Sequence, residues 1–134
     1  MAKESGITTS VAVDDSGGSA RTISNDITNL DFSTPRNTQE VTVLDKSAVE
    51  RLQLLADFSV NLNGVFNDGA NMSHAVFATV PSSSVARTCT IAVSGQTLAC
   101  ETFFNDYALT RAASGELTFT TSGQLSGGAV PTWS

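Results

Sequence analysis

The amino-acid sequence predicts a mainly β fold, a small β-sandwich or partial barrel with one short flanking α-helix. In residues 51–66, apolar side chains occupy every second position, which is the period of an extended strand with one buried face. Ser and Thr supply 17 residues each while Lys occurs twice, a composition that favours strands and turns. Ordinary strands run about five or six residues. The long alternation therefore predicts a sheet that extends past its own core, as in subunits that share a larger sheet or barrel.

The length of 134 residues predicts one domain over 1–134, large enough to fold without metal or disulfide support. The net charge of -6 argues against a conventional nucleic-acid binder, which needs clustered Lys and Arg. No apolar stretch approaches the length of a membrane span, so no membrane insertion is expected. The opening ten residues contain no hydrophobic secretion signal, and we expect synthesis in a cytoplasm.

The first half of the chain predicts short strands separated by polar loops. Alternation over 7–13 predicts a first strand that ends at the turn cluster 14–18, and a shorter strand follows at 20–24. Residues 25–39 are rich in Asn, Asp and Thr and predict a loop with at most one short strand. Val41 and Val43 mark another strand, and Ser47 with Glu50 forms a capping-box pattern that allows one helical turn before the long strand.

Residues 71–80 predict the only true helix. Asn71 can cap it, Pro81 blocks its continuation, and the lone histidine, His74, is expected on the solvated side. The expected buried stripe consists of Met72, Ala75, Val76 and Val80. A helix of about ten residues cannot stand alone, so it must lie against the sheet.

The last third predicts a meander of strands at 85–93, 96–111 and 116–124. A two-residue turn at Ser94-Gly95 would place Cys89 opposite Cys100, as two reduced thiols packed as small hydrophobes or as a bridge formed later in oxidising surroundings. In the middle strand the apolar phase changes from even to odd positions. This predicts a bulge or bend within 102–106 that lets the strand leave one packing surface and join another.

The sequence lacks the side-chain patterns of an enzyme. His74 has no nucleophile context, since no serine lies in a GxSxG or similar motif. Glu101 and Asp106 are the best carboxylate pair, but both lie at the phase change of a strand. The early aspartates lack calcium-loop spacing, and the Gly-Gly pairs lack that of a phosphate loop. We predict no enzyme activity, no catalytic residues, no metal and no cofactor.

Three segments together resemble the tail tube proteins of long-tailed bacteriophages, in particular the compact versions of actinobacterial phages. They are DKSAVERLQLLADFSVNLNGVFN at 45–67, SHAVF at 73–77 and GELTFTTSGQLSGGAVPTW at 115–133. The resemblance implies a structural virion protein, the major tail tube subunit, assembled in a host bacterial cytoplasm as stacked hexameric rings. Strands of each subunit would join a ring-shaped inner β-barrel that conducts double-stranded DNA. The implied partners are further copies of the chain, the tape-measure protein, the tail terminator, and distal tail or baseplate proteins.

This resemblance assigns candidate surfaces for assembly. Either the polar positions of the long strand or the opposite face of the final meander would line the lumen, and the sequence leaves both open. The candidates on the long strand are Gln53, Asp57, Ser59, Asn61 and Asn63. A flexible loop over about 31–50 is the candidate for contact between rings, or else a solvated surface loop, with Arg36, Gln39, Glu40, Asp45 and Lys46 as its candidate residues. A C-terminal arm over about 126–134 ends in Trp133, which either folds back or docks on a neighbour.

Two other classes stay open at this stage. A tail terminator or head decoration protein could share the sheet-rich domain but would form one ring or a capping trimer. A carbohydrate-binding β-sandwich would need an exposed aromatic platform, for which only Trp133 and Tyr107 are available.

Overall fold

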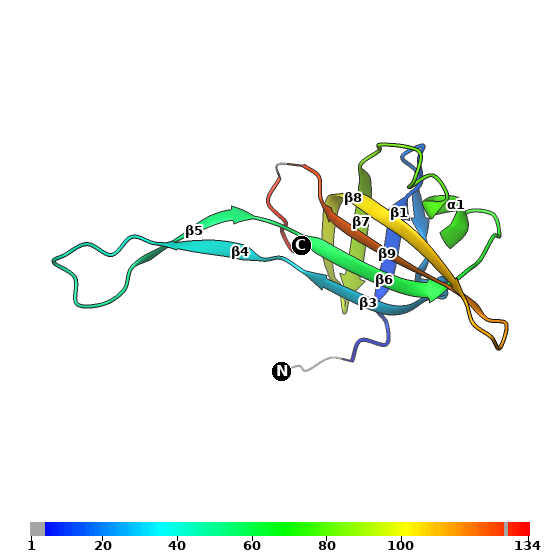
Figure 1. Cartoon of the computed structure of the whole chain (residues 1–134), viewed down its shortest axis with the longest axis horizontal. Helices are drawn as coiled ribbons and strands as arrows, with labels where there is room; N and C mark the ends of the chain where they lie inside the picture. Colours follow the sequence, from blue (N-terminus) through cyan, green and yellow to red (C-terminus); the bar gives the residue numbers. More distant parts are fainter. Residues whose placement is uncertain (1–4, 128) are drawn as a thin grey trace.

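Two layers of antiparallel sheet face each other, and one long strand belongs to both (Figure 1). The computed structural model describes residues 5–127 and 129–134. The strand order of the sheet is β2-β1-β7-β8-β9-β6-β3, and β4 and β5 form a separate pair. The elements are β1 (Ser10–Asp14), β2 (Ala20–Thr22), η1 (Ser24–Asp26), β3 (Ile27–Ser33), β4 (Arg36–Glu40), β5 (Arg51–Ala56), β6 (Ser59–Val65), α1 (Ser73–Phe77), β7 (Arg87–Val93), β8 (Gln96–Arg111) and β9 (Leu117–Leu125). The predicted mainly β class with one short helix is confirmed.

Strand β8 passes from one layer to the other at the bend that its sequence predicts. Its first part pairs with β7 as far as Thr102, and from Thr102 onward it pairs with β9. The register shifts between Phe104 and Asp106, inside the predicted interval. We call β2, β1, β7 and the start of β8 the first layer. The rest of β8 with β9, β6 and β3 is the second layer.

The core lies between these layers and is closed at one end by the helix. Phe77 of α1 packs against Phe104 of β8 and Phe119 of β9, with ring centroids 5.3 and 5.7 Å apart. Val60 and Leu62 of β6 are buried while Asn61 between them is exposed, so the predicted alternation is confirmed for this half of the long strand. Each such buried side chain contributes roughly 1.5–3 kcal/mol.

The single long strand predicted over 51–66 is wrong, because the chain breaks at Asp57 and Phe58 into β5 and β6. The backbone N–H of Asp57 donates to the carbonyl of Pro35, 3.0 Å away, and the N–H of Phe58 donates to the Asp57 side chain at 2.8 Å. These bonds take both amides out of the strand ladder. Phe58 is fully buried and anchors the start of β6, while β5 pairs only with β4.

The polar segment predicted as a loop contains two strands, β3 and β4. β3 pairs with β6, and β4 pairs with β5 to form a hairpin that projects from the body (Figure 1). We call residues 34–57 the arm and 41–50 its tip. The strand expected at Val41 and Val43 and the helical turn expected after Ser47 are both absent from this tip, which is held by Val41 N–H donating to the carbonyl of Glu50 at 2.9 Å. Every residue of β4 is exposed. Its sequence therefore has no alternation of apolar and polar residues from which a strand could be predicted.

The helix is shorter than predicted and is capped by a residue distant in sequence. Asn71 is not its cap, because it adopts a φ of +62° before the helix begins. The buried carboxylate of Asp26 accepts instead from the backbone N–H of Ser73 at 3.0 Å and from the Asn67 amide at 2.9 Å. The buried side of α1 therefore consists of Ser73, Val76 and Phe77. The predicted member Ala75 is exposed.

A buried arginine holds the other end of the helix. The Arg87 guanidinium donates to the carbonyls of Val76 at 2.9 Å and Asp14 at 3.2 Å, and to the Thr79 hydroxyl at 2.7 Å. Burial lowers the pKa of Arg87 from its ordinary value. Within the described residues, every buried side-chain nitrogen and oxygen has a hydrogen-bond partner. The helix thus joins the body at both ends through polar contacts that leave no buried group unpaired.

The β7–β8 hairpin has the predicted register. Ser94 and Gly95 have φ values of +50° and +83°, as a two-residue turn of mirror-image type requires. Cys89 lies directly opposite Cys100, and both are free and buried. The first strands are confirmed with small shifts of their ends, since β1 begins at Ser10 and β2 ends at Thr22.

We expect the stability of the protein to fall as pH rises from 9 toward 12. Burial, reinforced by Cys100, raises the pKa of the Cys89 thiol from 9.0 to about 12. In this range the unfolded chain loses the Cys89 proton while the folded chain keeps it, so the unfolding free energy drops by about 1.4 kcal/mol per pH unit from this group. Urea unfolding at several pH values, compared with Cys89→Ala, measures this slope. An equally steep slope in the variant would contradict the assignment.

Candidate assembly surfaces

Three of the lumen candidates lie together on the outward face of the second layer. Ser59, Asn61 and Asn63 alternate along β6 with the buried Val60 and Leu62. Their partners in β9 are Gln124, Ser122 and Thr120, and their partners in β3 are Ser33, Asp31 and Asn29. The two alternatives from the sequence, the long strand and the final meander, are therefore two parts of one surface. We call these nine residues, with Thr118, the polar face.

Hydrogen bonds connect the side chains of the polar face across the strands. The Thr120 hydroxyl donates to the Asn63 side-chain oxygen at 2.9 Å, and the hydroxyls of Ser33 and Ser59 lie 3.0 Å apart.

The strands of the second layer contain one cationic residue, Arg111, at the very end of β8. Arg111 pairs with Leu117, in the row of side chains that faces the core rather than the polar face. The polar face therefore carries no cation. The outward face of the second layer has two carboxylates, Asp31 of β3 and Asp106 of β8, which pairs with Ser122.

The other two lumen candidates lie elsewhere. Gln53 belongs to β5 on the arm, where its side chain accepts from the Arg36 guanidinium at 3.4 Å. Asp57 lies at the break between β5 and β6. Neither residue belongs to a strand of the second layer. The structure therefore does not bring them together with Ser59, Asn61 and Asn63.

The five candidates for contact between rings are spread along the arm and are all exposed. Arg36 donates through Nε and Nη2 to the carbonyl of Leu54, at 3.0 and 2.8 Å, and so ties β4 to β5. Gln39 and Glu40 follow on β4, and Asp45 and Lys46 lie in the tip. Lys46 pairs with Glu50 at 3.5 Å, an exposed ion pair that contributes at most about 1 kcal/mol.

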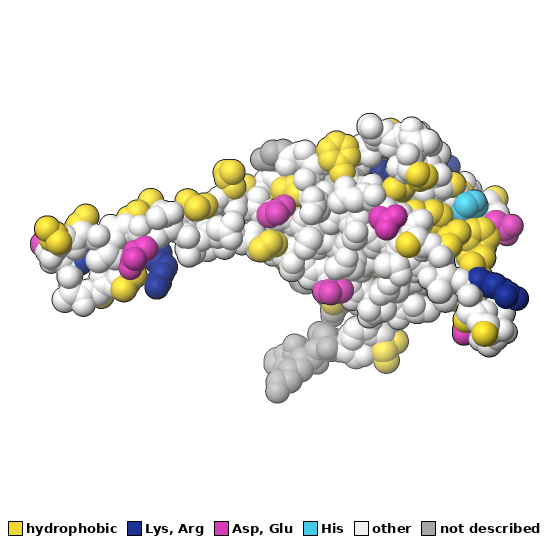
Figure 2. Space-filling view, in the orientation of Figure 1, with side chains coloured by type: hydrophobic (Ala, Val, Ile, Leu, Met, Phe, Trp, Pro, Cys, Tyr) yellow, Lys and Arg dark blue, Asp and Glu magenta, His cyan; other side chains and the backbone are white. Residues whose placement is uncertain are grey.

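The arm also displays exposed apolar side chains, among them Leu52 and Leu54, which the alternation in the sequence predicted to face a core. Its exposed large hydrophobic residues are Val41, Val43, Leu44, Val49, Leu52, Leu54 and Leu55. Leu44 is fully exposed, and Leu55 is 90% exposed. Figure 2 shows hydrophobic side chains along the length of the arm. Large apolar side chains exposed at this density on one projecting segment indicate a site of protein association.

Trp133 folds back onto its own chain. It forms an antiparallel bridge with Leu98, and the backbones of Ser134 and Thr97 exchange two hydrogen bonds of 2.9 Å. The indole lies 6.0 Å from the Phe32 ring and remains 45% exposed. The C-terminal residues therefore pair with β8 before Thr102, on the edge opposite β7. From Thr102 onward, β9 pairs with this same edge.

Two strand edges of the second layer have no neighbour within the described residues. β3 ends the strand order, and β8 loses its β7 partner after Thr102. Both edges therefore offer backbone N–H and C=O groups to another strand. Natural proteins normally cover such edges or pair them.

The single histidine is not the solvated residue expected from the sequence. His74 is half-buried, with Nδ1 3.2 Å from the Tyr107 hydroxyl and its ring 4.7 Å from that of Phe66. The buried side of α1 is formed by Ser73, Val76 and Phe77 rather than by the predicted stripe, so His74 lies at its border and faces Tyr107 of β8. Glu101 bonds the Thr88 hydroxyl, and Asp106 accepts from the N–H of Tyr107 at 2.9 Å.

The described residues contain no group of three or more His, Cys, Asp or Glu side chains arranged to hold a metal ion. Among the same residues, none of the helices has the length and apolar character needed to cross a membrane.

No family model matches the sequence, and neither does any curated protein. Solved structures do match in fold. A chain from the virion of a native gene transfer agent (GTA) particle superposes with a TM-score of 0.79 at 15% identity, covering 97% of this chain and 99% of that one. A chain from the tail of an empty GTA particle, a structure with C6 symmetry, gives a TM-score of 0.75 at 16% identity and covers 98% of both chains. At these identities the likeness shows a shared fold over essentially the whole length.

Proposed function

We propose that this chain is a structural virion protein, the major tail tube subunit, which polymerises as stacked hexameric rings into a hollow tube for double-stranded DNA. The observation that carries the proposal is the second layer, a four-stranded sheet with two unpaired edges and a cation-free outward face. The shared fold with a chain from a tail of C6 symmetry supports it. No catalytic role is proposed.

The strand directions of the second layer permit ring closure. β8 is antiparallel to β9, β9 to β6, and β6 to β3, so the two edge strands β8 and β3 also run in opposite directions. When copies are related by rotation about one axis, the β8 edge of one copy meets the β3 edge of the next in antiparallel orientation. Closure would produce a continuous antiparallel barrel without exposed edges.

The polar face is the surface that such a barrel would turn inward. The opposite face of the second layer packs on the first layer, which therefore lies on the outside of the ring. DNA carries one charge per about 1.7 Å of axis, and a wall rich in Lys or Arg would hold it through counterion release. A wall of Asn, Ser and Thr with two aspartates per copy, Asp31 and Asp106, would let it slide.

We expect Asp31→Lys combined with Asp106→Asn to convert the proposed tube into a DNA-binding tube. The two substitutions remove both carboxylates of the outward face and place six cations per proposed ring on it, so DNA should be retained at low salt and released as salt rises. Co-sedimentation of assembled tubes with double-stranded DNA over a salt series measures this. Ala99→Lys places the same number of cations on an exposed position of the first layer and should leave the binding near that of the wild type. Equal DNA retention by both variants would argue against an inward polar face.

The arm is proposed to connect successive rings. It continues the β3–β6 pair beyond the end of the second layer, because β4 follows β3 and β5 precedes β6 (Figure 1). In a barrel built from these strands, a hairpin on their ends projects past the rim of the ring. Its apolar surface would then be covered by the next ring. Tape-measure, terminator and distal tail proteins would contact the same ring surfaces at the ends of the tube.

Electron microscopy of the purified protein tests the proposal. Hollow tubes with sixfold rings, formed alone or after addition of a tape-measure or initiator protein, are the expected result. Isolated rings that never stack would favour a tail terminator or decoration role. Persistent monomers under all of these conditions would refute the tube.

A further inference from the structure

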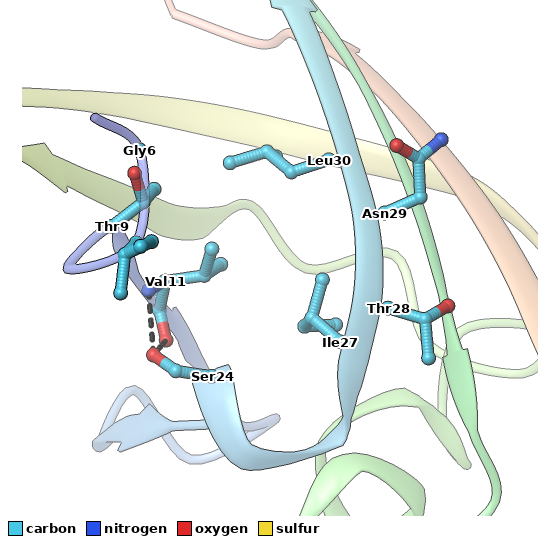
Figure 3. Close-up of a pocket in the computed structure, with 9 residues that line it drawn as sticks. Gly6, Thr9, Val11, Ser24, Ile27, Thr28, Asn29 and Leu30 are labelled. Carbon is cyan, nitrogen blue, oxygen red and sulfur yellow. Dashed lines mark hydrogen bonds between the residues drawn. The ribbon is translucent and has the colours of Figure 1, made fainter. Parts of the chain in front are cut away.

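The sandwich is open on one side, along the β3 edge. β8 joins the two layers on the other side, but between β1 and β3 there is no shared strand. A cavity of about 280 Å³ lies there, lined by Ile7, Thr9 and Val11 from the N-terminal segment and by Ile27 and Leu30 from β3. In Figure 3 the side chains of Ile27 and Leu30 point away from the neighbouring strand toward Val11 and Thr9. Both pack against the hydrophobic core and are only partly buried.

The opposite edge of the second layer carries the complementary feature. Leu109 is 45% exposed, and Tyr107 two residues before it is half-buried. Both lie near the end of β8, after the bend, where the first layer no longer covers the strand. Their side chains are on the face of the sheet that packs against the core.

The strand registers place these residues in the same rows as the residues of the cavity. Leu109 pairs with Phe119, Phe119 with Gly64, and Gly64 with Ile27. The next row runs in the same way from Tyr107 through Thr121 and Leu62 to Leu30. Both rows are buried in their middle. The first row is open at both ends, whereas Tyr107 at the end of the second row packs on Phe77 and lies within hydrogen-bond distance of His74 in its own subunit.

We infer that Leu109 of one copy fills the open side of the sandwich of the next copy in the ring, beside Ile27 and Leu30. This inference rests on the proposed ring and names the side chains that seal it. The occupant is a second copy of this chain, because repeating the layer by rotation brings the β8 edge of one copy, which carries Leu109, against the β3 edge of the next, which carries Ile27 and Leu30. With a volume of about 280 Å³, the cavity lies just below the range of ligand pockets, which hold roughly 300–1,000 Å³, and its lining mixes apolar side chains with Thr9, Ser24 and Asn29. It suits a few side chains from a neighbouring edge rather than a cofactor.

Cysteine cross-linking in assembled tubes tests the inference. Leu109→Cys is combined with Ile27→Cys or with Leu30→Cys, and the tubes are treated with a short flexible bis-maleimide. We expect a ladder of covalent oligomers ending at the hexamer on a denaturing gel. The buried native thiols should not react, so wild-type tubes serve as the blank. The combination of Leu109→Cys with Ala99→Cys, an exposed position of the first layer, should give no ladder.

The outcomes separate this inference from the proposed function. Tubes that form but give no ladder with either pair would overturn the lateral contact and leave the tube intact. Wild-type protein that never forms rings or tubes would overturn the proposed function itself. As a second measurement, Leu109→Asp should remain a folded monomer by circular dichroism and form no rings, whereas Leu109→Met should assemble. Normal assembly of Leu109→Asp would overturn the inference without any cross-linking.

Discussion

Replacing residues 35–57 by Asn-Gly is expected to abolish stacking of rings while the body of the protein keeps its thermal stability. The replacement removes the arm and joins β3 directly to β6 through a two-residue turn that suits a hairpin. None of the deleted residues is buried, and the core residue Phe58 is retained. The melting temperature should therefore change by no more than a few degrees. Circular dichroism measures the melting temperature, and electron microscopy shows whether rings or tubes form.

A point variant tests the apolar surface of the arm without changing its length. Leu44→Asp combined with Leu55→Asp places two charges on the most exposed leucines of the arm. Burying either carboxylate in an interface is costly, so tubes should be absent while the fold persists. Ala99→Asp, a charge on an exposed position of the first layer, provides the control and should assemble normally. For the deletion of residues 35–57, the contradicting outcome is a protein that still forms long tubes, because the arm would then have no role in stacking.

The largest loss of stability is expected for Gly64→Ala. A methyl group on Gly64 would overlap the backbone carbonyl oxygen of Asp26 and would lie 2.7 Å from the Phe119 ring. The carbonyl belongs to the residue whose carboxylate caps α1, so relief of the overlap would disturb the helix and the core together. We expect a loss of about 3 kcal/mol or more in the free energy of unfolding, measured by urea denaturation.

Gly127→Ala is the matched control for this prediction. A methyl group on Gly127 would meet only the Glu101 side chain at 3.8 Å, an ordinary contact. The stability of this variant should equal that of the wild type or exceed it slightly, since alanine restricts the unfolded chain. Similar stabilities of Gly64→Ala and Gly127→Ala would show that Gly64 of β6 does not lie this close to Asp26 of η1 and the Phe119 ring.

The final meander was predictable because its signals are local. Ser94-Gly95 specifies the turn, and the turn sets the register that places Cys89 opposite Cys100. The change of apolar phase within β8 predicted the bend, since a strand whose buried side alternates must switch packing surfaces. Pattern and turn chemistry agree throughout this segment, and the structure follows them.

The arm and the helix were predicted less well because their determinants are not local. Alternation at Leu52 and Leu54 indicates a face that avoids water, but it does not say that the covering surface belongs to the same chain. The helix is capped by Asp26, 47 residues before Ser73, and no sequence window contains both. Of the candidate lumen residues, those within β6 share one surface, whereas Gln53 and Asp57 are separated from it by the break at Phe58.

The break between β5 and β6 also affects how far the proposed tube can bend. The hairpin meets the rest of the molecule through two short chain crossings, around Pro35 and Asp57, and the ladder of β4 with β5 is not continuous with that of β3 with β6. The arm can change its angle to the body at this connection while Phe58 remains buried in the core. In the proposed tube, successive rings could then tilt against one another, and the tube could curve while the contacts within each ring are kept.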